Sequence, residues 1–141
     1  RSDIRGSIHG ITRDTSKSDI AMAALKSVCF QSKDLFLCLK KDMKDTPSQY
    51  VMRVDGGMSQ NNLMIQYLSD LLQVPIERPM IQETTVMGVA FLAGLQFGLY
   101  KSIAELRDLW KTDQVFEPIF GGEQANEEYD HWLEIIKRET K

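Results

Sequence analysis

The sequence predicts an α/β fold in which a small sheet is flanked by helices. Segments with apolar residues every three to four positions, typical of amphipathic helices, alternate with short β-rich or extended segments. A glycine pair at the end of one β-rich segment leads directly into a helical one, which indicates a strand, a tight turn and a helix in succession. Only two or three strands are evident. Because so thin a sheet is marginally stable by itself, we expect either that helices supply most of the core or that strands before residue 1 are missing.

Size and composition narrow the class of protein. The chain has 141 residues, which suits one domain or a piece of one, and it begins with arginine rather than an initiator methionine. Its net charge of −3 lacks the basic excess that nucleic-acid binding requires. The longest mostly apolar stretch, Val86–Leu95, is far shorter than the roughly 20 residues that cross a bilayer. We therefore expect a soluble domain that binds neither nucleic acid nor membrane.

The two cysteines predict a reducing compartment. Cys29 and Cys38 fall on one predicted helix, which separates them by about 13 Å along the axis, whereas a disulfide needs Cα atoms within about 7 Å. Unpaired thiols and the absence of a signal peptide are typical of cytoplasmic proteins. We therefore expect a cytoplasmic location.

The first part of the chain predicts a strand and a long helix. Ile4–Thr12 intersperses apolar residues with small ones and contains two glycines, which favours a strand. Ser18 is the expected N-cap of a helix that runs to about Lys41, where lysines complement the negative end of the helix dipole. The apolar face of this helix is expected to comprise Ile20, Ala24, Val28, Gln31, Leu35 and Leu39.

The middle of the chain predicts a strand, a turn, a helix and a short extended segment. Tyr50–Asp55 is β-rich enough for a buried strand. Asn61–Gln73 has the four-residue apolar spacing of an amphipathic helix, and Pro75 prevents its continuation. Val74–Pro79 is expected to be extended because it carries a proline near each end.

The last part of the chain predicts three more helices. Glu83–Phe97 is an apolar helix with several small residues, and Gly98 ends it. Ser102 has a glutamate three positions later, which is the spacing of a capping box, and this predicts a short helix ending near Trp110. After an extended segment, Glu123–Thr140 forms an amphipathic tail helix. The stripe that packs on the rest is expected to comprise Tyr129, Trp132, Leu133 and Ile136.

The glycine pair lies in the sequence VDGGMSQNN, residues 54–62, and has two interpretations. Glycines let a ligand approach the main chain, and the following helix presents unpaired N–H groups and its positive dipole end to an anion or a polar ring. Asn61, in the first turn, adds directional hydrogen bonds. Alternatively, the segment is a tight turn with Asp55 or Ser59 capping the helix and no ligand at all. Chemistry alone leaves both interpretations open.

Other chemistry finds no support in the sequence. His9, His131 and the two distant cysteines lack the spacing of a zinc site. The P-loop, the dinucleotide fingerprint and the Gly-x-Ser-x-Gly elbow are absent from the sequence. We therefore assign neither a catalytic residue nor a metal ligand in this chain.

Three segments carry a family resemblance. Arg53–Ser102, which contains VDGGMSQNN, resembles the C-terminal region of the FGGY carbohydrate kinases, most closely those that act on glycerol. Arg5–Gln31 resembles the second signature of the same family, in register with the first segment. The sequence FEPIF, residues 116–120, and the tryptophan-bearing tail resemble the family's C-terminal end. The resemblance thus covers nearly the whole chain.

The resemblance implies a fold and an activity. It implies that residues 1–141 are the C-terminal part of the second, nucleotide-binding domain of an actin-like (ribonuclease H-like) ATPase fold. It implies an ATP-dependent kinase that uses Mg²⁺ and phosphorylates glycerol. The polyol contacts and the catalytic carboxylate would lie before residue 1, so the isolated chain is expected to be inactive. Two alternatives stay open, namely another FGGY sugar or polyol kinase and a non-catalytic interaction module. A homo-oligomer of the full-length enzyme is a further expectation.

The resemblance also assigns individual residues. Gly57 and Asn61 match the family's nucleotide-contacting glycine and asparagine, and Gly56 forms the other half of the turn. Glu83–Thr85 and Gly88–Gly94 match a stretch that we interpret as a structural helix packed close to the sheet. Lys26 departs from the family signature, which usually has an acidic or amide residue there, and we expect it on an exposed helix face.

Overall fold

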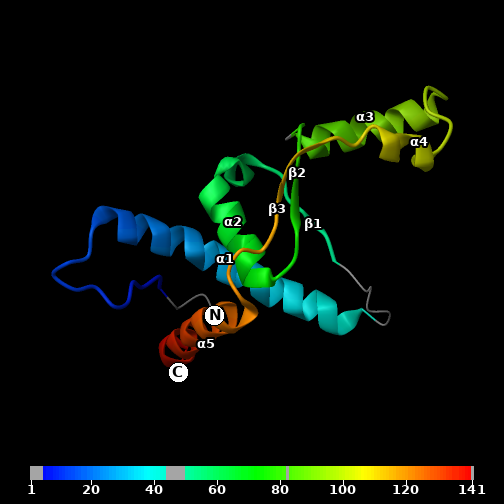
Figure 1. Ribbon diagram of the computed structural model, residues 1–141. Coiled ribbons are helices and arrows are strands. Elements are labelled where there is room, and N and C mark those ends of the chain that lie inside the picture. Colours follow the sequence, from blue (N-terminus) through cyan, green and yellow to red (C-terminus); the bar gives the residue numbers. More distant parts are fainter. Residues whose placement is uncertain (1–4, 44–49, 82, 141) are drawn as a thin grey trace.

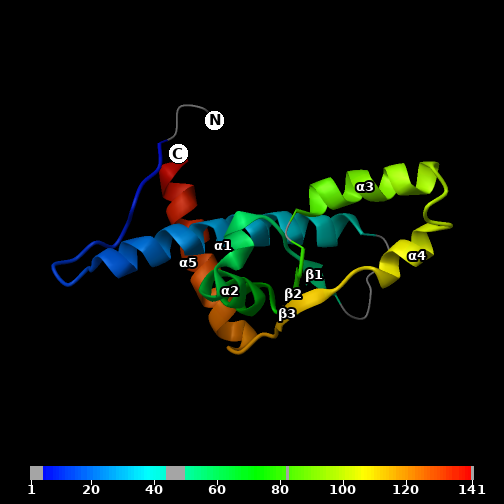
Figure 2. The same ribbon diagram turned by 90° about the horizontal axis from the view of Figure 1, so that it is seen from above.

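The computed structural model describes residues 5–43, 50–81 and 83–140, which form a body and an arm (Figure 1). The elements are α1 (Lys17–Asp42), β1 (Met52–Arg53), the 3₁₀ helix η1 (Gly57–Gln60), α2 (Asn62–Leu72), β2 (Ile76–Pro79), α3 (Thr84–Gln96), α4 (Ile103–Asp108), β3 (Thr112–Phe116) and α5 (Gly122–Glu139). The body comprises α1, α2, α5 and the three strands. The arm comprises α3 and α4, which project to one side in both views (Figure 2). The predicted α/β class, a small sheet flanked by helices, is confirmed.

The sheet determines where the glycine turn lies. Its strand order is β1-β2-β3, with β1 and β2 parallel and Met52 opposite Ile76. Strand β3 runs antiparallel to β2, with Phe116 opposite Ile76. Parallel neighbours need a crossover, and here η1 and α2 form it. The turn between β1 and α2 therefore lies at the carboxyl end of a strand, the edge at which α/β proteins place ligands.

The core of the body is built around α2. Ile65 and Leu71 of α2 and Ile76 of β2 are at most 2% exposed. Helices α1 and α5 both pack on α2, and the stacked rings of Phe30 and Trp132, 5.5 Å apart, join α1 to α5. Of the predicted stripe on the tail helix, Tyr129 is buried and Trp132 and Leu133 pack against the core, whereas Ile136 is exposed.

Helix α1 differs from its prediction at its start and on its buried face. Its N-cap is Ser16, not Ser18, and the Ser16 side chain and Asp19 form a reciprocal capping box. Leu35, expected to be buried, is 68% exposed, whereas Cys29 and Lys33 face the core. Apolar residues occur on several faces of this helix, so periodicity alone did not identify the one that α2 covers.

The prediction of a strand at the N-terminus is wrong for the described residues. Residues 5–12 form no strand, and Ile4 lies outside the described residues. This segment runs beside the C-terminal part of α5, where His9 Nε2 lies 3.3 Å from Glu139 Oε1. A strand needs a neighbour to pair with, and no strand of the sheet reaches this segment.

The arm also departs from its prediction. Helix α3 projects beyond the sheet instead of packing close to it (Figure 1). Leu92 and Phe97 are 69% and 89% exposed, and Gly94 is buried by the ring of Tyr100. A helix that is apolar on all sides needs cover on all sides, and the described residues cover only one. No helix in the described part of the chain is long and apolar enough to cross a bilayer.

Candidate functional site

Gly56 is required by the backbone of the turn. Val54 N–H still donates to Glu77 O at 3.1 Å, so the chain stays in the sheet until Asp55. Gly56 then adopts φ 85° and ψ 174°, a conformation essentially restricted to glycine. Its carbonyl accepts hydrogen bonds from Ser59 N at 3.1 Å and Ser59 Oγ at 2.7 Å, which close the turn into η1. Gly56 therefore has a structural reason to be glycine.

Gly57 has no such reason within the described residues. It begins η1, and its φ lies outside the left-handed region. A Cβ added to it would meet no atom of the described residues within 4 Å. Neither strain nor packing here excludes a side chain, so this residue leaves a bare, exposed main chain in front of α2.

Asn61 completes the turn as the N-cap of α2. Its Oδ1 accepts a hydrogen bond from Met64 N at 3.1 Å, so the prediction that Asp55 or Ser59 caps this helix is wrong. Asp55 instead accepts a hydrogen bond from Thr84 Oγ1 at the start of α3. The Asn61 side chain is exposed, and among the described residues its Nδ2 group makes no hydrogen bond. Its two N–H bonds remain available to a ligand.

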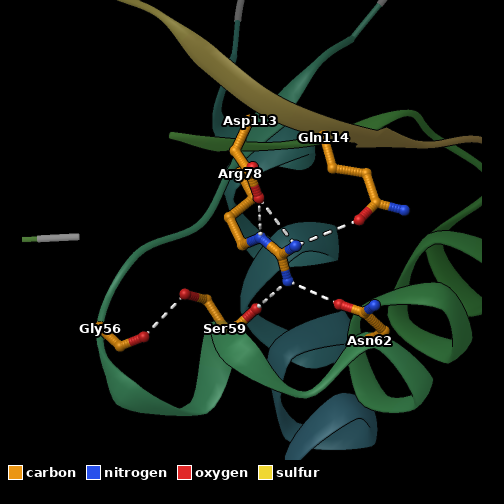
Figure 3. A network of polar contacts seen from close by, with 6 residues as sticks. All are labelled: Gly56, Ser59, Asn62, Arg78, Asp113 and Gln114. Carbon is orange, nitrogen blue, oxygen red and sulfur yellow. Dashed lines mark hydrogen bonds and ion pairs between the residues drawn. The ribbon is translucent and has the colours of Figure 1, made fainter. Parts of the chain in front are cut away.

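A buried arginine lies between the turn and strand β3 (Figure 3). Arg78 of β2 is 8% exposed, and its Nη1 donates to Ser59 O at 3.0 Å and to Asn62 Oδ1 at 2.7 Å. Its Nε donates to Asp113 Oδ2 at 2.8 Å and its Nη2 to Gln114 Oε1 at 3.1 Å. One guanidinium group therefore ties η1 and α2 to β3.

Arg78 was not predicted as a site residue, although the sequence carries a signal for it. Side chains two positions apart on a strand point to the same face, so Arg78 shares the face of the fully buried Ile76. A charged residue on a core face requires buried partners. The buried face shared by Ile76 and Arg78 was not predicted, because the two prolines of this segment indicated only an extended connection.

A second polar cluster joins the helices of the body. Lys26 Nζ lies 2.7 Å from Glu128 Oε2, to which Tyr67 Oη donates at 2.6 Å. Burial opposes the charged form of Glu128, but the hydrogen bonds from Lys26 and Tyr67 outweigh it and hold the pKa of Glu128 below its ordinary value. Burial and the bond to Glu128 raise the pKa of Tyr67. Lys26, expected on an exposed face, is therefore half-buried and holds α1 to α5.

The turn is suited to binding rather than to catalysis. It combines exposed main chain, the N-terminus of α2 and the free Asn61 amide, which together suit an anion or a polar ring. Cys29 is buried, and burial raises the pKa of its thiol to about 11, so it is a poor nucleophile. Within residues 5–43, 50–81 and 83–140, no three His, Cys, Asp or Glu side chains gather closely enough to hold a metal ion.

Comparison with known proteins decides the family. The model of the FGGY family of carbohydrate kinases, C-terminal domain, matches residues 1–97. The chain belongs to this family. A glycerol kinase of Marinomonas sp. (strain MWYL1) is 48% identical to this FGGY chain over 136 residues, and one of Bacillus subtilis (strain 168) is 42% identical. These matches include 96% of the chain but only 27% of each relative.

Solved structures place this FGGY chain in the same fold. It matches a crystal structure of Plasmodium falciparum glycerol kinase with ADP at a TM-score of 0.86 and 32% identity, covering 98% of this chain and 27% of that one. A ligand-bound xylulose kinase from Lactobacillus acidophilus matches at a TM-score of 0.76, with 95% of this chain and 27% of that one covered. At 23% identity, this second match supports the fold alone. The predicted actin-like kinase fold is confirmed.

Proposed function

We propose that this chain is the C-terminal part of the second, nucleotide-binding domain of an ATP-dependent glycerol kinase. The full enzyme would transfer the γ-phosphoryl group of ATP to a hydroxyl of glycerol, giving ADP and glycerol 3-phosphate. Support comes from relatives named glycerol kinase, 42–48% identical over nearly the whole chain. Since the chain spans 27% of those relatives, its share of the reaction is a part and not the whole.

The proposed share is nucleotide binding by Gly56, Gly57 and Asn61. The observation that carries this proposal is the open space at Gly57, where the described residues give no structural reason for glycine. A nucleotide lying against the bare main chain would supply that reason. The Nδ2 group of Asn61, four residues further on, would donate to the sugar or the base. Gly56 contributes by turning the chain so that both residues lie at the mouth of α2.

The catalytic groups and the substrate contacts are proposed to lie outside this chain. Phosphoryl transfer depends mostly on positioning and charge neutralisation, to which Mg²⁺ would contribute positive charge, while a carboxylate would activate the hydroxyl. The described residues offer no acidic cluster for the cation, so Mg²⁺ would arrive with ATP. The two unpaired cysteines suit the cytoplasm, where we place the enzyme.

The variant Gly57→Ala in the full-length kinase tests nucleotide binding. The added methyl group fits the unliganded chain without strain, so the melting temperature should change little. It would occupy space that we assign to the nucleotide, so the KM for ATP should rise by about tenfold while the KM for glycerol stays within about twofold. Steady-state kinetics with each substrate varied in turn measures both quantities. An unchanged KM for ATP would refute the assignment of Gly57.

Gly121→Ala is the matched control. Gly121 has φ −71°, and an added Cβ there also meets nothing within 4 Å, but it lies at the start of α5, away from the turn. This variant should leave both KM values unchanged. The activity is tested separately with a panel of glycerol, xylulose and gluconate. Preferred turnover of xylulose or gluconate would refute glycerol as the substrate but would leave the proposed nucleotide site intact. The 141-residue chain alone should give no turnover.

A further inference from the structure

We propose that Arg78 is a positioning residue for the nucleotide, acting through the turn that carries Gly56, Gly57 and Asn61. It does not reach the ligand itself, because its guanidinium group is buried between the turn and β3 (Figure 3). Instead it fixes the conformation in which the turn presents its main chain and the Asn61 amide. The inference rests on the proposed nucleotide site, and the experiments below separate the two.

The hydrogen bonds connect Arg78 to the glycine turn in two steps. Nη1 donates to the main-chain carbonyl of Ser59, and Ser59 in turn donates through N and Oγ to the carbonyl of Gly56. The same Nη1 donates to Asn62 Oδ1, next to the helix cap Asn61. The arginine therefore holds both ends of the segment on which the proposed site is built.

The other edge of the guanidinium group is anchored to β3. Asp113 and Gln114 accept hydrogen bonds from Nε and Nη2, and the Phe116 ring lies 5.4 Å from Cζ. A buried charge is costly unless it is paired and hydrogen-bonded, and here Asp113 pairs with it at 2.8 Å. Because its acceptors are spread over η1, α2 and β3, the planar guanidinium group has little freedom to move. The turn that is hydrogen-bonded to it is therefore also held in place.

The pairing with Asp113 also argues for positioning rather than for direct attraction of phosphate. Arg78 is already paired with Asp113, whose Oδ2 lies 2.8 Å from Nη2, which reduces its attraction for an anion on the exposed face of the turn. The effect of Arg78 on ATP should therefore come from geometry, and it should not extend to glycerol. A purely structural arginine would instead alter stability without separating the two substrates.

The experiment uses the full-length kinase with Arg78→Met and Arg78→Lys. Methionine keeps an unbranched apolar stem but has no guanidinium group and donates nothing, so the KM for ATP should rise by about tenfold, equivalent to about 1.4 kcal/mol, with the KM for glycerol within about twofold. Lysine should restore part of the loss, because an ammonium group can donate to the turn but cannot also hold Asp113 and Gln114. Calorimetric titration with ADP should give the same order of affinities.

Ser69→Ala is the matched control for lost buried hydrogen bonds. Ser69 Oγ is buried in the same body and donates to Val74 O and Phe116 O, with O···O distances of 2.9 and 2.8 Å, without touching the turn. The variant Ser69→Ala should lower the melting temperature and leave the KM for ATP unchanged. If Ser69→Ala raises the KM for ATP as much as Arg78→Met does, the positioning role is overturned.

Two further outcomes separate the inference from the proposed function. If Gly57→Ala weakens ATP binding and Arg78→Met does not, the nucleotide site stands and the role of Arg78 is refuted. If neither variant changes the KM for ATP, both the nucleotide site and the role of Arg78 are refuted. Should Arg78→Met not fold, Asn62→Ala removes one contact with the turn while keeping the arginine. That variant should raise the KM for ATP selectively by a few-fold, and an unchanged value would refute the inference.

Discussion

The body and the arm each contain an apolar helix, but the apolar side chains of the helix in the body are buried whereas many of those in the arm are exposed. In the body, Leu71 of α2 is fully buried because α1, α5 and the sheet converge on that helix. In the arm, Leu92 of α3 is 69% exposed, and the ring of Tyr100, which lies against Gly94, shields only part of the helix. Apolar composition therefore shows that a helix needs cover, whereas burial depends on whether neighbouring elements provide it.

The exposure of α3 bears on the rest of the full-length protein. Helix α3 has the composition of a helix that is covered on every side, and the chain spans 27% of its relatives. We expect the full-length protein to cover the arm with residues that this chain does not include. Asp55, which follows β1, already links the start of α3 to the glycine turn through Thr84. The position of the arm and that of the proposed nucleotide site are therefore expected to be coupled.

The largest expected effect contrasts one leucine from each part. Leu71→Ala creates a cavity in a closed core and should cost about 2–5 kcal/mol of the free energy of unfolding. Leu92→Ala should cost less than about 0.5 kcal/mol in the 141-residue chain, because its side chain is already in water. Urea unfolding of both variants measures the difference. Equal losses would show that the arm is covered in solution.

A smaller loss of stability is expected from a substitution within the arm. A Cβ added to Gly94 would lie 2.6 Å from two carbon atoms of the Tyr100 ring, so Gly94→Ala must displace that ring at a cost of about 1–3 kcal/mol. Hydrogen exchange should become faster for amides of α3 and stay unchanged for those of α2. Gly88→Ala is the control, because its added Cβ meets nothing within 4 Å and alanine favours the helix. Faster exchange in α2 as well would contradict the prediction that the loss of stability is confined to the arm.

The sequence predicted local features well and long-range packing poorly. The helix at 62–72, the short helix capped by Ser102 and the tail helix were predictable because their signals lie within a few residues of one another. The strand expected from residue 4 to Thr12 and the packing of α3 on the sheet both require distant partners. In the described part of the chain no strand pairs with residues 5–12, and α3 projects away from the sheet, so local pattern alone gave the wrong answer.

The candidate site shows the same division. The tight turn and its glycines were evident from VDGGMSQNN, and the structure gives Gly56 the positive φ that such a turn needs. The support beneath the turn was not predicted, because Arg78, Asn62 and Asp113 are far apart in the sequence and meet only in the folded chain. Identifying Asn61 rather than Asp55 as the helix cap likewise required the orientation of the side chains.

The smallest effect is a difference in acid sensitivity between the two parts. Glu128 accepts from Lys26 and Tyr67 in the body, and its pKa in the folded protein lies below the ordinary 4.5. Its contribution to stability is therefore fully present above that ordinary value and is lost as the pH falls through the lower, folded value. Glu128→Gln should remove this contribution, so the difference in urea midpoint between the wild type and the variant should shrink as the pH falls from about 6 to about 3.

The same titration followed by hydrogen exchange should loosen the contact of α5 with α1 and α2 before it affects α3, since the Glu128 cluster joins helices of the body alone. Lys26→Met provides a second approach, because it removes the cation while keeping an apolar stem over the Tyr67 ring. It should weaken the pH dependence in the same range. A difference between wild type and Glu128→Gln that stays constant with pH would mean that Glu128 contributes through its shape and not through its charge.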